Sequence, residues 1–367
     1  MTDLFSPASI DALTFDNRCL VAPMTRVSGT PEGLVGPLMT DYYRAFGTGG
    51  FGGIITEGVY TDKSHSQCYR NQPGIVDKTQ QDSWKSLIED VRQTGTRIIM
   101  QLMHAGALSQ FNRFRTDNRA PSAIAPRGEQ MSVYRGEGRY PAPEAMTAAE
   151  IREAINGFVE AGKRALDAGA DGVEVHGANG YLLDQFLTDY TNKREDAYGG
   201  DAGRRVQLTC EVLERLREAL GSAATIGVRI SQAKVNDFDH KWADGAKEAE
   251  VIFSRLKNAG ASYIHTTEFN ADAPAFETGP SLAEHAKTVT GLPVIANGSL
   301  DPKRARQMIA SGVADMVAIG KAALAAPDWP HYAQNNLQPP EFDFDMFSPL
   351  ADLQSAADYR ARQAKSA

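Results

Sequence analysis

Eight short apolar runs alternate along this chain with seven amphipathic helical patterns, and this alternation constrains the fold more than any other feature. Strands that alternate with helices form parallel sheets with right-handed crossovers. The helical patterns cover residues 38–46, 80–93, 148–168, 204–220, 246–258, 282–290 and 302–309. The strand-like runs cover residues 19–22, 53–56, 97–102, 172–175, 225–230, 263–266, 293–296 and 316–319. Eight is the number of strands that closes an α/β barrel.

We predict a (β/α)8 TIM barrel because the eighth unit ends the pattern and no ninth strand follows it. An open doubly wound sheet is the alternative that the same units could form. All 367 residues, 1–367, are assigned to one domain. Residues 1–17 are expected to form a cap or a short hairpin, and residues 338–367 a C-terminal extension. Residues 104–146, which contain several prolines, form a long insertion after the third strand, as lids and substrate-shaping loops do.

The charge and the cysteines exclude several classes of protein. A net charge of −8 argues against nucleic-acid and membrane-surface partners, which usually require basic patches. Cys19, Cys68 and Cys210 are too isolated for a disulfide framework or an iron–sulfur site, and no metal site is predicted from the scattered histidines. There is no signal-like amino terminus and no run of 18 apolar residues, so we expect a cytoplasmic protein.

The stretch from Val173 to Leu187, VEVHGANGYLLDQFL, carries the first group of candidate residues. We predict a strand that ends near residue 175, a turn over residues 177–180 and then a helix. This places His176, Asn179 and Tyr181 beyond a strand's carboxyl end, where α/β folds build their sites. Two of them can donate hydrogen bonds to an oxygen that gains charge, and the third is a phenol that can act as a general acid. The alternative is a hydrogen-bonded turn with a surface tyrosine.

Other polar residues follow the remaining strands and are expected to meet at the same barrel mouth. Arg229 within GVRIS is notable because a buried guanidinium requires an anion or several acceptors. The alternative is an ion pair with Glu57 or Glu174. The Gln101 side chain offers one hydrogen-bond acceptor and two donors, which suit the edge of a ring that carries carbonyl and N–H groups side by side. The alternative is a buried glutamine whose amide is hydrogen-bonded within the core.

The last two strands are followed by Asn297-Gly298-Ser299 and by Gly320-Lys321. Barrel enzymes often bind phosphate after these two strands, because glycines there allow backbone N–H groups to approach the ligand closely. Lys321 adds a positive charge. The sequence therefore predicts a phosphate-bearing ligand, with plain turn glycines as the alternative.

Taken together, these segments resemble the Old Yellow Enzyme family of flavin-dependent ene-reductases along nearly the whole chain. Each motif is a modest signal alone, but their order and spacing are highly specific. The motifs are APMTR at 22–26, TEG at 56–58, QLMHAG at 101–106, the stretch 173–187, NKREDAYGG at 192–200, VRIS at 228–231 and IGK at 319–321.

The resemblance implies a barrel that binds FMN non-covalently. NADPH or NADH would reduce the bound FMN. It implies that Thr25 binds the flavin C4 carbonyl, Gln101 the pyrimidine edge, and Arg229 the region of N1 and the C2 carbonyl. Gly298, Gly320 and Lys321 would hold the phosphate. The other residues that the resemblance assigns to cofactor binding are Pro23, Met24, Glu57 and Asn297.

The resemblance also implies the chemistry on the substrate, an electron-poor alkene with a carbonyl or nitro group. His176 and Asn179 would bind the activating oxygen as hydride arrives at the β-carbon, and Tyr181 would protonate the α-carbon. Met103 and Phe347 would contact the substrate. The implied enzyme is an NADPH dehydrogenase or enoate reductase, with the oligomeric state, monomer or homodimer, left open.

Four residues depart from the family pattern, and two other functions remain as alternatives. Lys321 stands where arginine is usual, Ala107 where arginine is frequent, Met103 where a tryptophan often narrows the pocket and Ser348 where a tyrosine is expected, so the substrate range is the weakest inference. One alternative is a flavin-dependent dehydrogenase or nitroester reductase of the same superfamily. The other is a phosphate-binding barrel lyase without flavin.

Overall fold

Eight parallel strands close into a barrel in the computed structural model, which describes residues 3–366. Each strand pairs with its neighbours in parallel, and pairing of β4 with β6 completes the ring. The barrel strands are β3 (Cys19–Val21), β4 (Gly53–Ile55), β6 (Arg97–Met103), β9 (Gly172–Asn179), β10 (Thr225–Lys234), β11 (Tyr263–Thr267), β12 (Val294–Asn297) and β13 (Met316–Ile319). A short strand, β5 (Val59–Tyr60), pairs with the end of β6. The predicted closed barrel is confirmed, and the open sheet is excluded.

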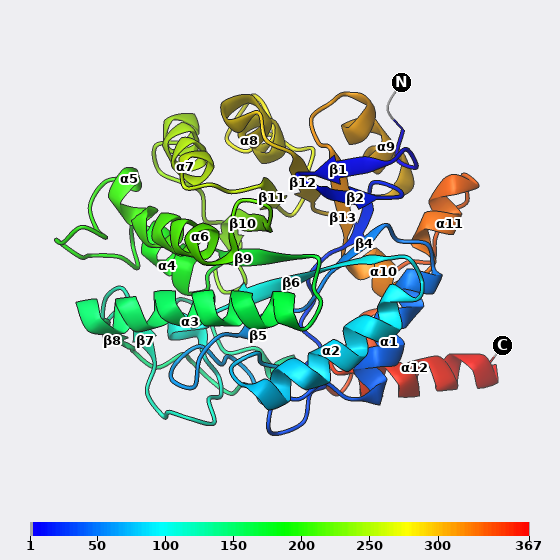
Figure 1. Cartoon of the computed structure of the whole chain (residues 1–367), viewed down its shortest axis with the longest axis horizontal. Helices are drawn as coiled ribbons and strands as arrows, with labels where there is room; N and C mark the ends of the chain where they lie inside the picture. Colours follow the sequence, from blue (N-terminus) through cyan, green and yellow to red (C-terminus); the bar gives the residue numbers. More distant parts are fainter. Residues whose placement is uncertain (1–2, 367) are drawn as a thin grey trace.

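Helices surround the strands (Figure 1). The helices of the barrel are α1 (Pro37–Thr48), α2 (Lys78–Arg92), α3 (Ala148–Asp167), α6 (Gln207–Leu220), α7 (Ala246–Asn258), α8 (Leu282–Thr290) and α9 (Pro302–Ala310). The prediction of one helix over 204–220 was wrong at its start, because a separate turn, α5 (Ala202–Arg205), precedes α6. There the Arg205 guanidinium donates hydrogen bonds to the backbone oxygens of Leu187 and Gly200, which ties α5 to the preceding loop.

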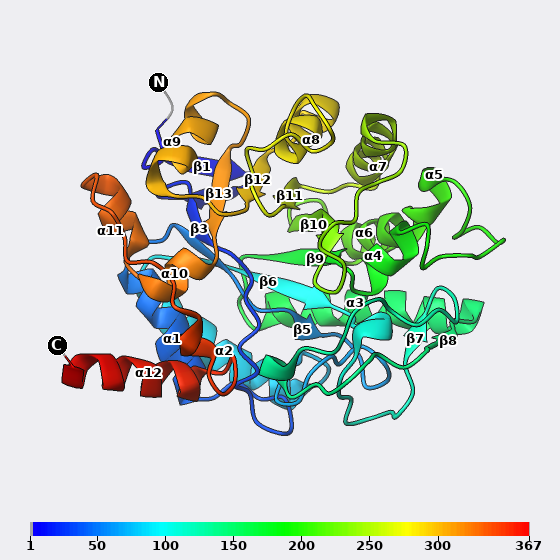
Figure 2. The same cartoon turned by 180° about the vertical axis from the view of Figure 1, so that it is seen from behind.

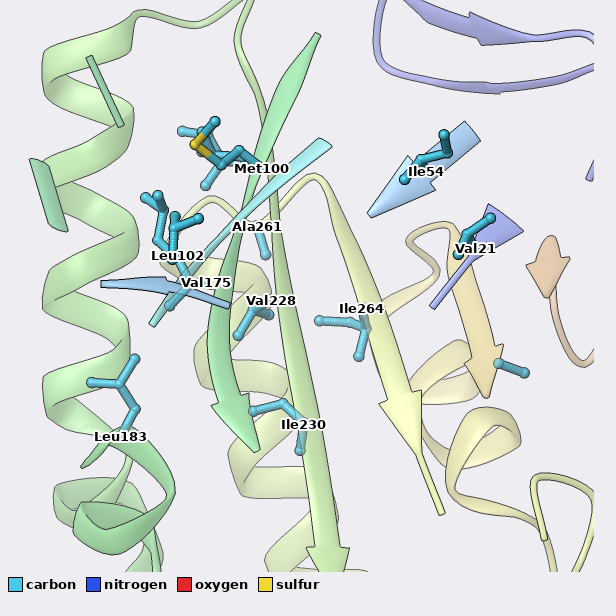
Figure 3. Close-up of a cluster of buried hydrophobic side chains, with 14 of the residues drawn as sticks. Val21, Ile54, Met100, Leu102, Val175, Leu183, Val228, Ile230, Ala261 and Ile264 are labelled. Carbon is cyan, nitrogen blue, oxygen red and sulfur yellow. The ribbon is translucent and has the colours of Figure 1, made fainter. Parts of the chain in front are cut away.

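Two apolar layers follow from the alternation of side chains along the strands. Outward residues such as Val175, Val228 and Ile264 belong to the large buried cluster between strands and helices (Figure 3). Inward residues form a smaller cluster at the amino-terminal end of the barrel. The hairpin of β1 (Ala8–Ile10) and β2 (Leu13–Phe15) adds Ile10 and Phe15 to that cluster, so the predicted cap closes the end opposite the mouth.

The insertion after β6 and the C-terminal extension contact each other. The insertion contains η1 (Gly106–Leu108), β7 (Arg119–Ala120), η2 (Ser132–Tyr134) and β8 (Glu144–Ala145), and the extension contains η3 (Phe344–Phe347) and α12 (Leu353–Ser366) (Figure 2). The Ala351 amide donates to the Val133 carbonyl at 3.0 Å, and Arg135 pairs with Asp352 at 3.5 Å. Arg26 also donates to the Asp352 carbonyl, at 2.9 Å. Three segments distant in sequence are thereby joined beside the carboxyl ends of the strands.

None of the helices between residues 3 and 366 combines the length and hydropathy that crossing a bilayer requires.

Helix α3 begins with a complete capping box, which gives a testable contribution to stability. The Thr147 hydroxyl accepts from the Glu150 amide at 3.2 Å, and the Glu150 carboxylate accepts from the Thr147 amide at 2.8 Å. We expect Thr147→Ala to lower the free energy of unfolding by about 1 kcal/mol, because one amide of the first turn loses its acceptor. Urea denaturation followed by circular dichroism measures this. Thr147→Ser keeps the oxygen and is the control; equal losses in both variants would contradict the capping role.

Candidate active site

A cavity of about 910 Å³ opens at the carboxyl ends of the barrel strands. It brings together residues as far apart in the sequence as Ala22 and Phe347. Among the residues that line it are all but one of those predicted for the site: Pro23, Met24, Thr25, Gln101, Met103, His176, Asn179, Tyr181, Arg229, Asn297, Gly298, Gly320, Lys321 and Phe347. Within residues 3–366 no group of three or more His, Cys, Asp or Glu side chains is arranged to hold a metal ion.

Glu57 is the predicted site residue that the structure does not bring to the cavity. It is buried, and its Oε2 accepts a hydrogen bond from the Arg26 amide at 3.0 Å. Its own amide donates to the Tyr43 hydroxyl at 2.9 Å. Burial raises the pKa of Glu57 to about 7. Glu57 therefore supports the backbone that carries Thr25 from behind.

Strand β9 places His176, Asn179 and Tyr181, but the predicted turn over residues 177–180 was wrong. The strand continues to Asn179, opposite a register shift in β10 between Ile230 and Lys234. The Asn179 amide donates to the Ser231 hydroxyl at 2.8 Å, and the Val235 amide donates to the Asn179 carbonyl at 3.1 Å. Asn179 itself adopts φ +62°, a conformation that asparagine tolerates better than most residues. The chain turns only after it, and α4 (Leu182–Leu187) follows Tyr181.

A buried ion pair holds this turn in place. Lys234 Nζ lies 2.8 and 2.9 Å from the two carboxylate oxygens of Asp184, and both side chains are almost fully buried. Asp184 Oδ2 also accepts from the Gly180 amide at 2.6 Å. The peptide between Asn179 and Tyr181 is thus fixed by a carboxylate that lies on α4 and by a lysine on β10.

Arg229 lies deep in the barrel, in register with His176 on one side and His265 on the other. Its Nη2 donates to Asn297 Oδ1 at 2.7 Å, and its Nε has no hydrogen-bond partner among the described residues. Within residues 3–366 no carboxylate lies within ion-pairing distance of it, so the alternative of a pair with Glu57 or Glu174 does not hold. Burial lowers the pKa of Arg229 to about 10, against the effect of the Glu174 charge. The side chain is therefore cationic at neutral pH.

Glu174 connects a polar layer just below Arg229. Its Oε1 accepts from Gln101 Nε2 at 2.8 Å, and its Oε2 accepts from the Tyr263 hydroxyl at 3.0 Å. His265 Nδ1 lies 2.9 Å from Oε2. Burial alone would raise the pKa of Glu174, but the charges of His265 and Arg229 and the hydrogen bonds from His265 and Gln101 outweigh burial. The pKa of Glu174 therefore lies below its ordinary value. The ionised Glu174 carboxylate accepts a hydrogen bond from Gln101 Nε2. The side-chain nitrogen of Gln101 therefore points toward Glu174, and its side-chain oxygen points away from Glu174.

His176 and Tyr181 face each other across 5.1 Å between ring centres. Burial, and then the charges of Arg229 and His265, lower the pKa of His176 well below its ordinary value. The imidazole is therefore neutral at pH 7, and its Nδ1 has no hydrogen-bond partner among residues 3–366. Burial raises the pKa of Tyr181 well above 10, so the phenol keeps its proton. A neutral ring with an N–H group and a protonated phenol thus line one cavity wall.

Several residues at the site were not predicted from the sequence. Tyr134 and Met131, from the insertion, line the cavity, and the Tyr134 hydroxyl donates to the Thr25 carbonyl at 3.3 Å. The hydroxyl of Tyr69 lies 2.7 Å from that of Tyr181. These residues lie in loops without a repeating pattern, so the sequence offers no periodic signal for them.

The segment after β12 approaches its neighbour closely. A Cβ atom on Gly298 would lie 2.3 Å from the Glu268 carbonyl oxygen, so a larger residue would displace the backbone. The following Ser299 adopts φ +46°. Gly320 and Lys321 line the same part of the cavity. The glycine at 298 is therefore required by a close backbone approach, which a plain surface turn would not need.

Comparison with known proteins shows that this chain is similar to flavin oxidoreductases in sequence and in structure. A model of the NADH:flavin oxidoreductase / NADH oxidase family matches residues 3–339. An NADH oxidase of Thermoanaerobacter brockii is 33% identical over 92% of this chain, which spans only 51% of that protein. A probable flavin mononucleotide-dependent alkene reductase of Leishmania infantum is 32% identical, with 89% of this chain and 88% of the relative covered. The structure of an old yellow enzyme homologue from Zymomonas mobilis superimposes with a TM-score of 0.85 at 27% identity, over 94% of this chain and 96% of that one.

Proposed function

Because the chain belongs to the NADH:flavin oxidoreductase / NADH oxidase family and is a member of the Old Yellow Enzyme family, we propose that it is an FMN-dependent ene-reductase. Its substrates in this proposal are α,β-unsaturated carbonyl or nitro compounds, reduced at the C=C bond with NAD(P)H. The observation that supports the proposal most is the pairing of neutral His176 with protonated Tyr181 on the wall of a cavity that also contains cationic Arg229.

The residues present fit FMN. The cavity of about 910 Å³ lies within the range of roughly 300–1,000 Å³ that is usual for cofactor and ligand sites. A buried guanidinium with an Nε that lacks a partner requires a ligand acceptor, which a ring carbonyl would supply. Lys321 and the closely packed Gly298 provide charge and backbone access for a phosphate.

In this proposal the residues that would hold the cofactor are those that the family resemblance assigned to it, apart from Glu57. Arg229, Gln101 and Thr25 would hold the ring system, and Arg229 would stabilise negative charge at its pyrimidine edge. Pro23 and Met24 would line its binding wall. Asn297, Gly298, Gly320 and Lys321 would hold the phosphate end. FMN, when bound, supplies hydride transfer from NAD(P)H to an electron-poor carbon.

His176 and Asn179 would bind and orient the substrate's activating oxygen. The neutral imidazole donates a hydrogen bond without adding a full charge, and the Asn179 side-chain nitrogen, Nδ2, offers a second donor from the end of β9. Both residues lie on β9, and the pairing of β9 with β10 holds their backbone in place before the oxygen gains negative charge. Such preorganised donors stabilise an enolate-like transition state more than they stabilise the ground state.

Tyr181 would hold the proton that the substrate α-carbon receives. A pKa raised by burial keeps the phenol protonated across the neutral range, so the acid form is always present. Met103 and Phe347 line the same cavity and would contact the rest of the substrate. Because Met103 stands where the family pattern often has a tryptophan, it would leave room for larger substrates.

The visible spectrum of the purified protein tests the proposal. We expect the absorbance of oxidised flavin, its loss on anaerobic addition of NADPH or NADH, and its return on addition of 2-cyclohexenone. Parallel reductions with the two nicotinamides decide which one the enzyme prefers. A protein that stays colourless after incubation with FMN would contradict flavin binding, and a reduced flavin that 2-cyclohexenone does not reoxidise would contradict ene reduction.

A further inference from the structure

The hydroxyl groups of Tyr69 and Tyr181 form a short hydrogen bond deep beside the cavity. Their oxygens lie 2.7 Å apart, although the residues are 112 positions apart in the sequence. Tyr69 is fully buried, and Tyr181 is only 6% exposed. Tyr69 comes from the loop that follows β5, a part of the chain to which neither the sequence motifs nor the proposed function assigns a role.

The direction of this hydrogen bond matters for an acid. If Tyr181 donated to Tyr69, its proton would point away from the cavity, where the substrate must receive it. If Tyr69 donates, the proton of Tyr181 is free to point into the cavity, while its oxygen lone pair is already engaged. Tyr181 lines the cavity and Tyr69 does not, which favours the second arrangement.

The surroundings of Tyr69 hold its hydroxyl in place. Its ring packs against the ring of Tyr134, with 4.7 Å between centres. Its backbone carbonyl accepts from Gln67 Nε2 at 3.1 Å and from the Gln72 amide at 3.2 Å. The loop is therefore anchored on both sides of the residue, and a donor that is already positioned costs no reorganisation when charge develops.

We propose that Tyr69 is a positioning residue for Tyr181: it donates a hydrogen bond to the Tyr181 oxygen, directs the Tyr181 proton into the cavity and stabilises the phenolate that proton transfer leaves behind. This inference rests on the proposed function. In the step, the O–H bond of Tyr181 breaks, its electron pair stays on oxygen, and the enolate electron pair forms the new C–H bond at the α-carbon. Tyr181 then regains a proton from water, and Tyr69 keeps its own.

Burial raises the pKa of both phenols well above the ordinary value of a tyrosine, so both keep their protons at neutral pH. A hydrogen bond donated by Tyr69 would make loss of the Tyr181 proton easier than burial alone allows.

The kinetic test uses Tyr69→Phe, which removes one oxygen and keeps the ring packing. We expect reoxidation by 2-cyclohexenone in anaerobic stopped-flow measurements to slow by about tenfold to a hundredfold, the range for a hydrogen bond to a charged group. Reduction by NAD(P)H should be unchanged. In a Tyr181→Phe background the same substitution should have almost no further effect, because the two hydroxyls act together. Full additivity of the two losses would overturn the proposal.

A matched control comes from the same apolar cluster. Tyr140 is also buried there, and its hydroxyl bonds to Gln110 Oε1 at 3.2 Å rather than to Tyr181. Tyr140→Phe therefore removes a buried hydroxyl without touching the acid, and enone reoxidation should keep its rate. If Tyr140→Phe slows the step as much as Tyr69→Phe does, general loosening of the cluster explains the effect and the proposal fails.

A second readout does not depend on activity. With 3,5-difluorotyrosine at position 181 of the flavin-loaded protein, ¹⁹F NMR measures the pKa of that phenol directly. We expect Tyr69→Phe to raise this pKa by about 1 unit, which corresponds to the tenfold effect. An unchanged or lower pKa would overturn the role of Tyr69 even if enones are reduced. A raised pKa in a protein that reduces no enone would instead show that the proposed function is wrong.

Discussion

Replacing Tyr181 with phenylalanine is expected to slow enone reduction by about a hundredfold to ten-thousandfold, the usual contribution of a positioned acid. The phenol keeps its proton at neutral pH because burial raises its pKa, and it lies beside the donors expected to bind the substrate oxygen. Phenylalanine preserves the shape of the cavity wall but has no proton to give. Protonation of the α-carbon would then depend on water, which is not held in position as the phenol is and is therefore a slower proton donor.

Separate measurement of the two half-reactions checks this expectation. Reduction of the flavin by NAD(P)H requires no proton transfer to carbon, so Tyr181→Phe should leave its rate unchanged. Turnover with ferricyanide, an acceptor that needs no proton on carbon, should also survive and shows that the variant is folded and loaded. An enone rate equal to that of the wild type would show that another group protonates the α-carbon.

Lys234→Met is expected to lower the free energy of unfolding by about 3–5 kcal/mol, the range for breaking one side of a buried ion pair. The substitution leaves the Asp184 carboxylate in the interior, where its side chain is fully buried, without its positive partner. Asp184 also accepts from the Gly180 amide, so the strain reaches the turn that carries Asn179 and Tyr181. Urea denaturation followed by circular dichroism gives the loss of stability.

Two further variants isolate the cause of that loss. Lys234→Met combined with Asp184→Asn removes the unpaired charge but keeps an oxygen for Gly180, so it should be more stable than Lys234→Met alone. Lys78→Met breaks an exposed ion pair with Asp82 and should cost less than about 1 kcal/mol. Similar losses for Lys78→Met and Lys234→Met would contradict the assigned role of burial.

The barrel and most of its mouth could be predicted because both depend on local patterns. A two-residue period along each strand places Val228 and Ile230 outward, so it must place Arg229 inward. The same reasoning directs His176 and Gln101 toward the interior. The polar mouth therefore follows from the strands themselves, without knowledge of how distant segments pack.

The features that could not be predicted depend on partners far along the chain. Strand β9 extends to Asn179 because β10 supplies Ser231 and a register shift opposite it, which the sequence of β9 does not encode. Glu57 lies just beyond a strand end, yet the Arg26 amide draws its carboxylate behind the cavity wall. Tyr69 meets Tyr181 only after the loop beyond β5 has folded. The cytoplasmic setting, which nothing in the fold addresses, stays a prediction.

The C-terminal extension contacts Arg26 and the insertion but lies outside the barrel. This has a consequence for how the substrate range of the protein can evolve. Residues 338–342 and Phe347 line the cavity, yet none of them belongs to a barrel strand. Substitutions there can reshape the cavity wall while the eight strands and the donors they carry remain as they are. Selectivity for substrate size can therefore evolve, or be engineered, in the last tenth of the chain, separately from the residues on and just after the barrel strands that would carry out the reaction.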